Sequence, residues 1–275
     1  MRLVRLYSTG NPCPASCRPT WIDVAGERIL LYESIAEDKS TANAIATRLW
    51  RCALGTAAWL GEQAHVFDEQ TVLEVGAGTG LCSMVLAATS TARVIASDLD
   101  HTAVELVRAA ADHQALQLDG VLAFDLDSDK LLPEAQWLIA CDVMYTPSLA
   151  VALARRCAEQ LMRGGHVLVT DPDRPPRVAF QAELDRRLGQ PTNFVRLQEA
   201  SPLDEMVRAA VCDGRGAALV LLLVDERCRP PFSGGAPSRE TGQAVRAPGA
   251  TESPLITETA QPFAQGRDSP SRTLI

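Results

Sequence analysis

The sequence predicts an α/β protein with a doubly wound, mostly parallel sheet of seven strands. From residue 71 onward, short aliphatic runs alternate with segments of helical periodicity, which is the pattern of a parallel sheet covered by helices. A glycine-rich segment, Gly76-Ala77-Gly78-Thr79-Gly80, follows the first run. Acidic residues end four of the runs, at the edge where ligands bind in such sheets.

Two elements are predicted before the first run. Residues 21–33 predict two short strands joined by a turn near Gly26. Residues 41–60 have apolar side chains at steps of three and four, so they predict a helix with Trp50 and Arg51 near its middle.

Strands and helices then alternate along the chain. The predicted strands are 72–75, 93–98, 121–125, 137–142, 166–171, 194–197 and 217–225. The predicted helices are 82–88, 102–114, 149–161 and 178–188. The strand at 137–142 is apolar without alternation up to its final Asp, as expected of a strand buried on both faces.

We expect three parts in the chain. Residues 1–20 form an N-terminal extension, 21–227 the folded domain, and 228–275 a disordered tail that is rich in Pro and Gly and has no periodic apolar run. The extension contains Arg and Ser but no acid, so a short mitochondrial presequence stays open beside a plain extension.

Charge and hydropathy indicate which classes of partner the protein could bind. The net charge is −8, which disfavours nucleic acid and suits a basic partner such as a lysine-bearing protein surface. A merely soluble acidic domain explains the charge equally well. No apolar run reaches the roughly 18 residues of a membrane span, so we expect no membrane contact.

The cysteines and the expected compartment follow from the same composition. The eight cysteines are scattered, so we expect no metal site. A reducing, cytoplasmic compartment is predicted, with mitochondria as the alternative. We also expect a monomer.

The segment from Glu74 to Gly80 predicts a strand end, a tight loop and a helix N-terminus. Its glycines permit positive φ and close approach of a ligand, and the helix start offers free N–H groups. The spacing differs from the G-x-G-x-x-G of pyrophosphate binders, and an acid at the strand end suits a ligand with a cationic amine. The segment resembles motif I of the class I S-adenosylmethionine (SAM) methyltransferases. A glycine-rich turn in another α/β protein is the alternative.

That resemblance implies a Rossmann-like methyltransferase sheet with SAM as cofactor. Glu74 would act on the methionine end, Asp98 would accept the ribose hydroxyls, and Asp125 with Leu126 would lie at adenine. The predicted cofactor-binding residues are Trp50, Glu74, Gly76, Ala77, Gly78, Gly80, Asp98, Asp125, Leu126 and Cys141.

A second resemblance concerns the segment after the fourth strand. Asp142-Val143-Met144-Tyr145 resembles the D-x-x-Y signature of the seven-strand protein lysine methyltransferases, the family-16-like group. Residues 49–53 resemble that group's tryptophan-bearing helix, in which the Trp borders the cofactor. Three departures are Ala46 in place of the usual Gly, Arg51 in place of the frequent Pro, and Leu126 in place of the Trp that stacks on adenine.

Residues 170–176 resemble a D-P-G-R-P segment of a mitochondrial member of the same group, with Asp173 in place of the Gly. This segment would lie at the substrate lip, although a plain proline-rich loop is an equal alternative.

The resemblances imply methyl transfer from SAM to a lysine side chain of a protein. Asp142 and Tyr145 would be the catalytic residues that orient the amine. A small-molecule N-methyltransferase and a SAM-binding, non-catalytic partner protein stay open, because a fold by itself does not define a function.

Overall fold

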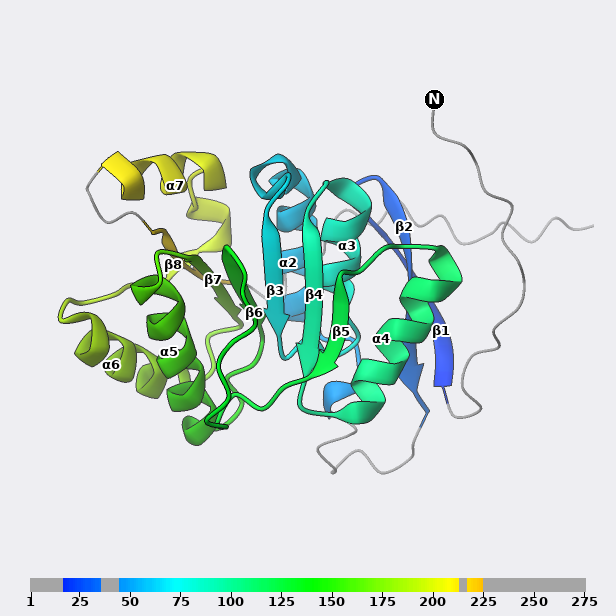
Figure 1. The fold of residues 1–275 in the computed structure, drawn as a ribbon, viewed down its shortest axis with the longest axis horizontal. Coiled ribbons are helices and arrows are strands. Elements are labelled where there is room, and N and C mark those ends of the chain that lie inside the picture. The colour runs from blue at the N-terminus through cyan, green and yellow to red at the C-terminus, as the bar shows by residue number, and fades with distance from the viewer. Residues whose placement is uncertain (1–16, 36–44, 213–216, 225–275) are drawn as a thin grey trace, which may run out of the picture. The chain divides into compact units, whose positions relative to one another are not determined.

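The computed structural model describes residues 17–35, 45–212 and 217–224. Within them, seven strands form one sheet: β3 (Thr71–Val75), β4 (Arg93–Asp98), β5 (Gly120–Ala123), β6 (Trp137–Cys141), β7 (His166–Asp171), β8 (Val195–Arg196) and β9 (Leu219–Leu223). Their order is β5-β4-β3-β6-β7-β9-β8, and the neighbouring strands pair in parallel. The predicted doubly wound sheet is confirmed (Figure 1).

Helices connect these strands. They are α2 (Arg51–Glu62), α3 (Leu81–Thr89), α4 (His101–Gln114), α5 (Pro147–Met162), α6 (Arg177–Leu188) and α7 (Leu203–Cys212), with 3-10 turns at Ala64–Phe67 and Leu197–Glu199. Side chains that cap the first turns define two of the starts: Asp100 accepts from the amides of Thr102 and Ala103 before α4, and Thr146 accepts from the amide of Leu149 in α5. The sequence pattern did not predict α7.

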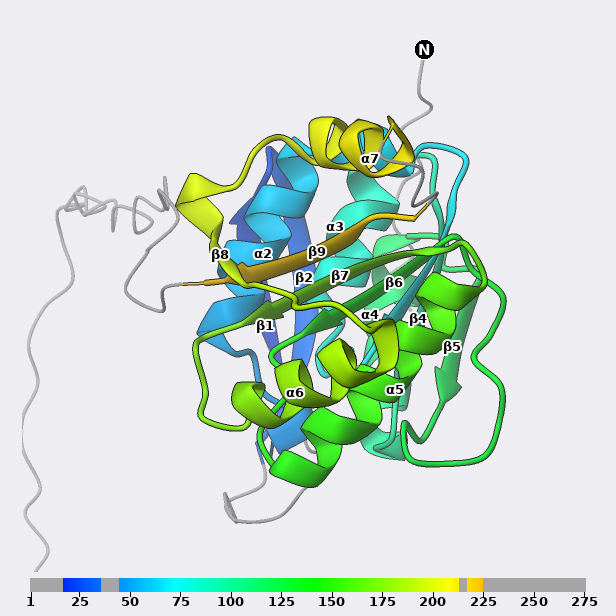
Figure 2. The same cartoon turned by 90° about the vertical axis from the view of Figure 1, so that its left-hand side faces the viewer.

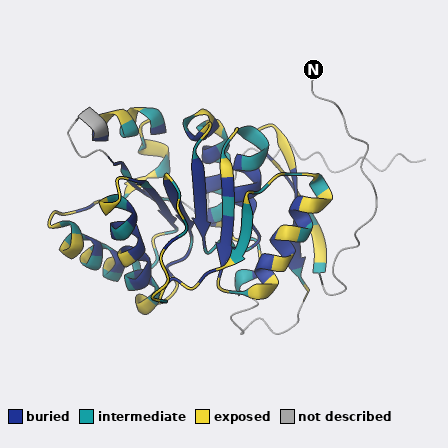
Figure 3. Cartoon of the chain, in the orientation of Figure 1, coloured by how far each residue is buried: buried dark blue, intermediate teal, exposed yellow. Residues whose placement is uncertain are grey.

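The sheet separates two hydrophobic clusters because successive side chains of a strand point to opposite faces. In β3, Val72 packs with α2, α3 and α4, whereas Leu73 and Val75 pack with α5 and α6. Figure 2 shows β7 and β9 running between α2 and the α5–α6 pair. The central strands β3 and β6 are buried along their whole length (Figure 3), so the sheet is a rigid base for the loops at its ends.

The predicted hairpin is confirmed as a separate two-stranded antiparallel sheet of β1 (Cys17–Val24) and β2 (Glu27–Ser34). It begins ahead of the expected start at Trp21. Strand β2 packs on α3 and α4, and one side chain of α4 completes its backbone pairing. Gln114 donates from Nε2 to the carbonyl of Leu30 (2.9 Å) and accepts at Oε1 from the amide of Leu30 (2.6 Å).

The predicted helix over 41–60 is wrong in its boundaries. Residues 36–44 lie outside the described part, the chain leaves helical geometry at residues 47–50, and α2 begins at Arg51. Two bonds from β2 hold this break: Glu33 Oε1 accepts from the amide of Leu49 (3.0 Å), and the Ser34 amide donates to the Thr47 carbonyl (3.1 Å). Trp50 is therefore the extended residue in front of α2 rather than a mid-helix residue.

The expected extension and tail fall largely or wholly outside the described residues, so the three-part division stays a prediction. Among the helices of the described part, none combines the length and apolar character that a bilayer crossing requires.

The Gln114 contact predicts a measurable contribution to stability. Replacing Gln114 with Ala should lower the free energy of unfolding by about 1–3 kcal/mol, because both backbone groups of Leu30 lose their partner. Urea denaturation measures this change, and hydrogen exchange should show faster exchange of the Leu30 amide. The exposed neighbour Gln117 is the matched control, since Gln117→Ala should change stability by less than about 0.5 kcal/mol. Equal effects of the two variants would contradict the assignment.

Candidate functional site

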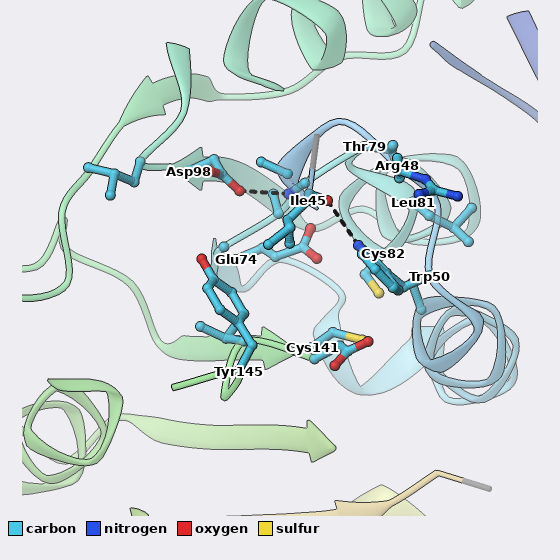
Figure 4. A pocket seen from close by; sticks show the side chains of 18 of the residues that line it. Ile45, Arg48, Trp50, Glu74, Thr79, Leu81, Cys82, Asp98, Cys141 and Tyr145 are labelled. Carbon is cyan, nitrogen blue, oxygen red and sulfur yellow. Dashed lines mark hydrogen bonds between the residues drawn. The ribbon is translucent and has the colours of Figure 1, made fainter. Parts of the chain in front are cut away.

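A cavity lies at the carboxyl ends of β3, β4 and β6. Its volume is about 820 Å³, which includes open solvent at its mouth, within the range of small-molecule sites. The predicted site residues that line it are Trp50, Glu74, Gly76, Ala77, Gly78, Asp98, Asp125, Leu126, Cys141, Asp142 and Tyr145. Figure 4 shows side chains from separate strand ends converging on this space, with Trp50 on the side away from Asp98.

The glycine loop shapes one wall of the cavity. Gly76 has φ of 64°, and a Cβ there would lie 2.7 Å from Cγ2 of Val143, so a side chain would clash with the segment after β6. Gly80 is not among the residues that line the cavity. It precedes α3 with φ of 78°, and a Cβ there would lie 2.8 Å from Cγ2 of Val107 in α4, so close packing of two helices accounts for this glycine.

Asp98 ties the glycine loop to the end of β4. Its Oδ2 accepts from the amide of Gly78 (2.8 Å) and its Oδ1 accepts from the amide of Asp100 (2.9 Å). Burial raises the pKa of Asp98, and these backbone donors oppose that rise. The carboxylate is therefore held in one orientation at the cavity wall.

Glu74 joins β3 to α3 beneath the loop. Its Oε2 accepts from the amide of Ser83 (2.9 Å) and from the Ser83 hydroxyl. Burial raises the pKa of Glu74 to about 8, and the bonds from Ser83 oppose that rise. The carboxyl group therefore holds a proton over much of the neutral range while it also lines the cavity.

The loop after β5 contributes another part of the cavity wall. The side chain of Asp125 accepts from the amide of Asp127 (2.9 Å), and Leu126 is buried. Arg156 of α5 is itself buried and holds this loop by donating to the carbonyls of Leu126 (2.9 Å) and Ser128.

Trp50 borders the mouth of the cavity. Its Nε1 donates to the carbonyl of Ile45 (2.9 Å), which fixes the ring over the break before α2. The guanidinium carbons of Arg48 and Arg174 lie 5.9 Å and 5.8 Å from the centre of the ring, within the range of cation–π contacts.

Asp142 stands directly after β6 in a conformation that is rare for residues other than glycine. Its φ is 58°, its amide donates to the Thr170 carbonyl of β7 (3.0 Å), and its side chain is 3% exposed. The carboxylate pairs with Nη2 of Arg174 at 2.6 Å. Left-handed backbone at a non-glycine residue is often retained at functional sites.

The turn after Asp142 brings Tyr145 to the same cavity. The amide of Tyr145 donates to the carbonyl of Val143 (3.0 Å), and the ring is 45% exposed. Partial burial raises the pKa of the Tyr145 hydroxyl, and Asp98 adds to the rise. Figure 4 shows the ring pointing from the end of β6 toward Glu74 and Asp98.

Cys141 lies at the floor of the cavity among other small polar groups. Its Sγ is 3.3 Å from Oγ1 of Thr56 and 3.9 Å from Sγ of Cys52. Thr56 donates in turn to Oγ1 of Thr170 (2.8 Å). These contacts join β6 to α2 and β7 below the site.

The sequence patterns did not predict some residues of the site. Ile45, Arg48, Leu99 and Phe124 line the cavity and stand next to or near predicted residues, so proximity in sequence could have found most of them. Arg174 was not predicted, although it lies in the segment 170–176 that was placed at the substrate lip. Its pairing with Asp142 joins two segments that no sequence pattern connects.

Comparison with known sequences relates the chain to lysine methyltransferases. A family model described as lysine methyltransferase matches residues 33–178. The human protein-lysine N-methyltransferase EEF2KMT is 28% identical over 59% of this chain and 56% of its own length. The mouse protein of the same name is 24% identical over 62% of this chain and 57% of its own. The chain thus spans a little over half the length of these curated relatives.

Comparison with solved structures shows the fold. The T. thermophilus 16S rRNA N2 G1207 methyltransferase RsmC, solved in complex with AdoMet and guanosine, superposes with a TM-score of 0.50 at 18% identity. The match covers 66% of this chain and 48% of that chain.

The buried carboxyl of Glu74 predicts a pH dependence of stability. The folded pKa of Glu74 is about 8 and its ordinary value is 4.5, so between these values the folded state keeps a proton that the unfolded state releases. Its contribution to stability is fully present below about pH 4.5 and is lost as the pH rises toward 8, by at most about 1.4 kcal/mol per pH unit. Glu74→Gln keeps an acceptor for Ser83 and should remove this part of the fall, which urea denaturation from pH 5 to 8 measures.

Ser83→Ala serves as the companion variant. It removes a hydroxyl that favours the charged carboxylate, so the decline should extend to higher pH than in the wild type. Identical pH dependence in the wild type and Glu74→Gln would show that Glu74 ionises in the folded state as it does in the unfolded state.

Proposed function

The chain belongs to the lysine methyltransferase family, and we propose that it transfers a methyl group from SAM to a lysine side chain of a protein substrate. The observation that carries this proposal is one cavity that joins the glycine loop and Asp98 to Asp142 and Tyr145. The glycine loop and Asp98 suit a nucleoside-bearing cofactor, whereas Asp142 and Tyr145 suit an amine acceptor.

The residues present fit SAM. Asp98 is positioned at the end of β4 to accept the ribose hydroxyls. Leu99, Phe124 and Leu126 line the cavity with apolar surface. An adenine ring would pack against these side chains, which here take the place of the Trp that stacks on adenine in the family. When bound, SAM supplies a methyl group on a positively charged sulfur, which is an excellent leaving group.

The chain's own residues then have two tasks, alignment of the amine and removal of its proton. Asp142 and Tyr145 lie on one turn and can orient the amine by hydrogen bonds, which contributes through positioning. Trp50, Val143 and the Tyr145 ring supply an apolar mouth, and desolvation there lowers the pKa of an entering lysine. We keep the expectations of a basic protein partner and of a cytoplasmic location with mitochondria as the alternative, which rest on composition, and the expectation of a monomer.

Labelling tests this proposal. Incubation of a cell lysate with the wild-type protein and tritiated SAM should label a protein, and mass spectrometry should find methyl-lysine in the labelled band. Asp98→Ala is the matched control: calorimetry should show SAM binding weaker by roughly 1–3 kcal/mol, the scale of a lost charged hydrogen bond, and labelling should fall accordingly. Label confined to small molecules, or SAM binding without any transfer, would replace the proposal with one of its two alternatives.

The acceptor residues predict a second outcome. Asp142→Asn should keep SAM affinity and lose most turnover, by at least about tenfold, because the amine loses a positioned carboxylate. Tyr145→Phe should lose less, since the ring that excludes water remains. Steady-state rates on the labelled substrate measure both, with the exposed Asp129→Asn as the control that keeps wild-type turnover. If Asp142→Asn were as active as that control, Asp142 would have only a structural role.

A further inference from the structure

Arg174 is held on three sides at the edge of the candidate site. Its Nη2 lies 2.6 Å from Oδ1 of Asp142, its guanidinium carbon lies 5.8 Å from the Trp50 ring centre, and its amide donates to Oδ1 of Asp171 (2.7 Å). The backbone is anchored at the end of β7, so the side chain has a defined path across the end of β6. Its side chain is 29% exposed, whereas that of Asp142 is 3% exposed, so the guanidinium is the more accessible member of the pair.

This pair places two opposite charges where the acceptor amine has to react. A buried carboxylate is costly without a cation, and the arginine guanidinium is charged at every accessible pH. The pair therefore presents a dipole with no net charge to the cavity. An entering lysine meets a neutralised carboxylate instead of a free anion.

Methyl transfer requires the lone pair of the lysine amine. Because the pKa of a lysine in water is about 10.4, a proton occupies that lone pair at neutral pH. A carboxylate without its arginine would stabilise the ammonium form and raise this pKa, against the need of the reaction. A guanidinium nearby has the opposite effect, because it repels a second cation. The charge on Arg174 thus favours the reactive form of the substrate.

We propose that Arg174 is a positioning residue that neutralises Asp142, so that the acceptor lysine is bound beside Asp142 as the uncharged amine. The inference rests on the proposed lysine methylation and assigns a residue that sets the protonation state of the substrate. In the transfer, the amine nitrogen forms a bond to the methyl carbon as the carbon–sulfur bond breaks. The electron pair of the broken bond stays on sulfur, and the resulting methylammonium then loses a proton to solvent and becomes the neutral amine.

Other ionisable groups face the same space. They are Arg48 before α2, Glu74 of β3, Cys82 of α3, Asp98 of β4, Asp125 after β5, Cys141 of β6 and Tyr145 after β6, with Asp171 of β7 against Arg174. Tyr145 also interacts with the charge of Arg174, and Cys52 of α2 with that of Asp142. All of these groups are common to all variants, so comparison between variants isolates the pair. Asp171 needs separate attention because burial raises its pKa to about 6 and Arg174 opposes that rise.

The test is the pH dependence of single-turnover methyl transfer at saturating SAM on the labelled substrate. The acidic limb is the part of the pH–rate profile in which the rate rises with pH as the lysine amine loses its proton. Arg174→Gln should move this limb to higher pH by about one unit or more, so that the rate falls at least about tenfold at neutral pH and recovers at high pH. Arg174→Lys keeps the charge and should keep the limb near its wild-type position. Asp142→Asn leaves the guanidinium without its anion and should move the limb to lower pH.

Two further variants assign the cause. Asp142→Asn combined with Arg174→Gln removes both charges and should return the limb toward the wild-type position, whereas a shift that persists would belong to Asp171 and overturn the proposal. Arg186→Gln removes an arginine that is paired with Glu183 on α6, away from the cavity, and should leave the limb unchanged.

The remaining outcomes are also decisive. An unshifted limb in Arg174→Gln, or a rate that does not recover at high pH, would show that Arg174 acts only in folding or in substrate docking. If Arg174→Gln fails to fold, an unshifted or upward-shifted limb in Asp142→Asn overturns the proposal on its own. Calorimetry of SAM binding and methyl-lysine formation by the wild type report separately on the proposed function, and their failure would remove both proposals.

Discussion

The parallel register of β3 with its two neighbours is the constraint on which the site depends. Val75 pairs with Ser97 of β4 and with Ala140 of β6, so these three strands end at the same level. Asp98, the last residue of β4, and Asp142, the residue after β6, therefore lie at one edge of the sheet beside the glycine loop. A slip of one residue would turn every side chain to the opposite face, and the two apolar clusters on either side oppose such a slip.

This edge gathers carboxyl groups in a largely buried setting, which is unfavourable unless each is satisfied. Two of them are satisfied by hydrogen bonds: Glu74 accepts from Ser83 and has a raised pKa, and Asp98 accepts from the amides of Gly78 and Asp100. The buried carboxylate of Asp142 is instead stabilised by its ion pair with Arg174. Backbone donors at a helix start and a loop are well suited to this role because their direction is set by the fold. The rigid apolar layers beneath offset the cost of holding these groups out of water.

The same arrangement links stability to the proposed chemistry. A site for a cationic cofactor and an amine acceptor needs negative charge on one side and a neutral environment on the other. Asp98 supplies the first at the end of β4, and the Asp142–Arg174 pair supplies the second at the end of β6. Trp50 and Tyr145 line the same cavity, so the groups that hold the fold at this edge are also those to which we assign roles in the reaction.

The sequence by itself determined the doubly wound sheet, the position of the glycine loop and the acids at the strand ends. These features are local, since aliphatic runs, helical periodicity and glycine spacing reflect the preferences of neighbouring residues. Local pattern misplaced the start of α2 because the break before it depends on bonds from Glu33 and Ser34 of β2. It also missed α7.

Only the tertiary structure decided which of these residues share a cavity and what each contacts. Gly80 was grouped with the other glycines by its spacing, but its packing partner is Val107 of α4. Arg174 belongs with Asp142 because β6 and β7 lie side by side in parallel, with an entire helix between them in the chain. Contacts of this kind depend on the crossover between strands, and no periodicity along the chain encodes them.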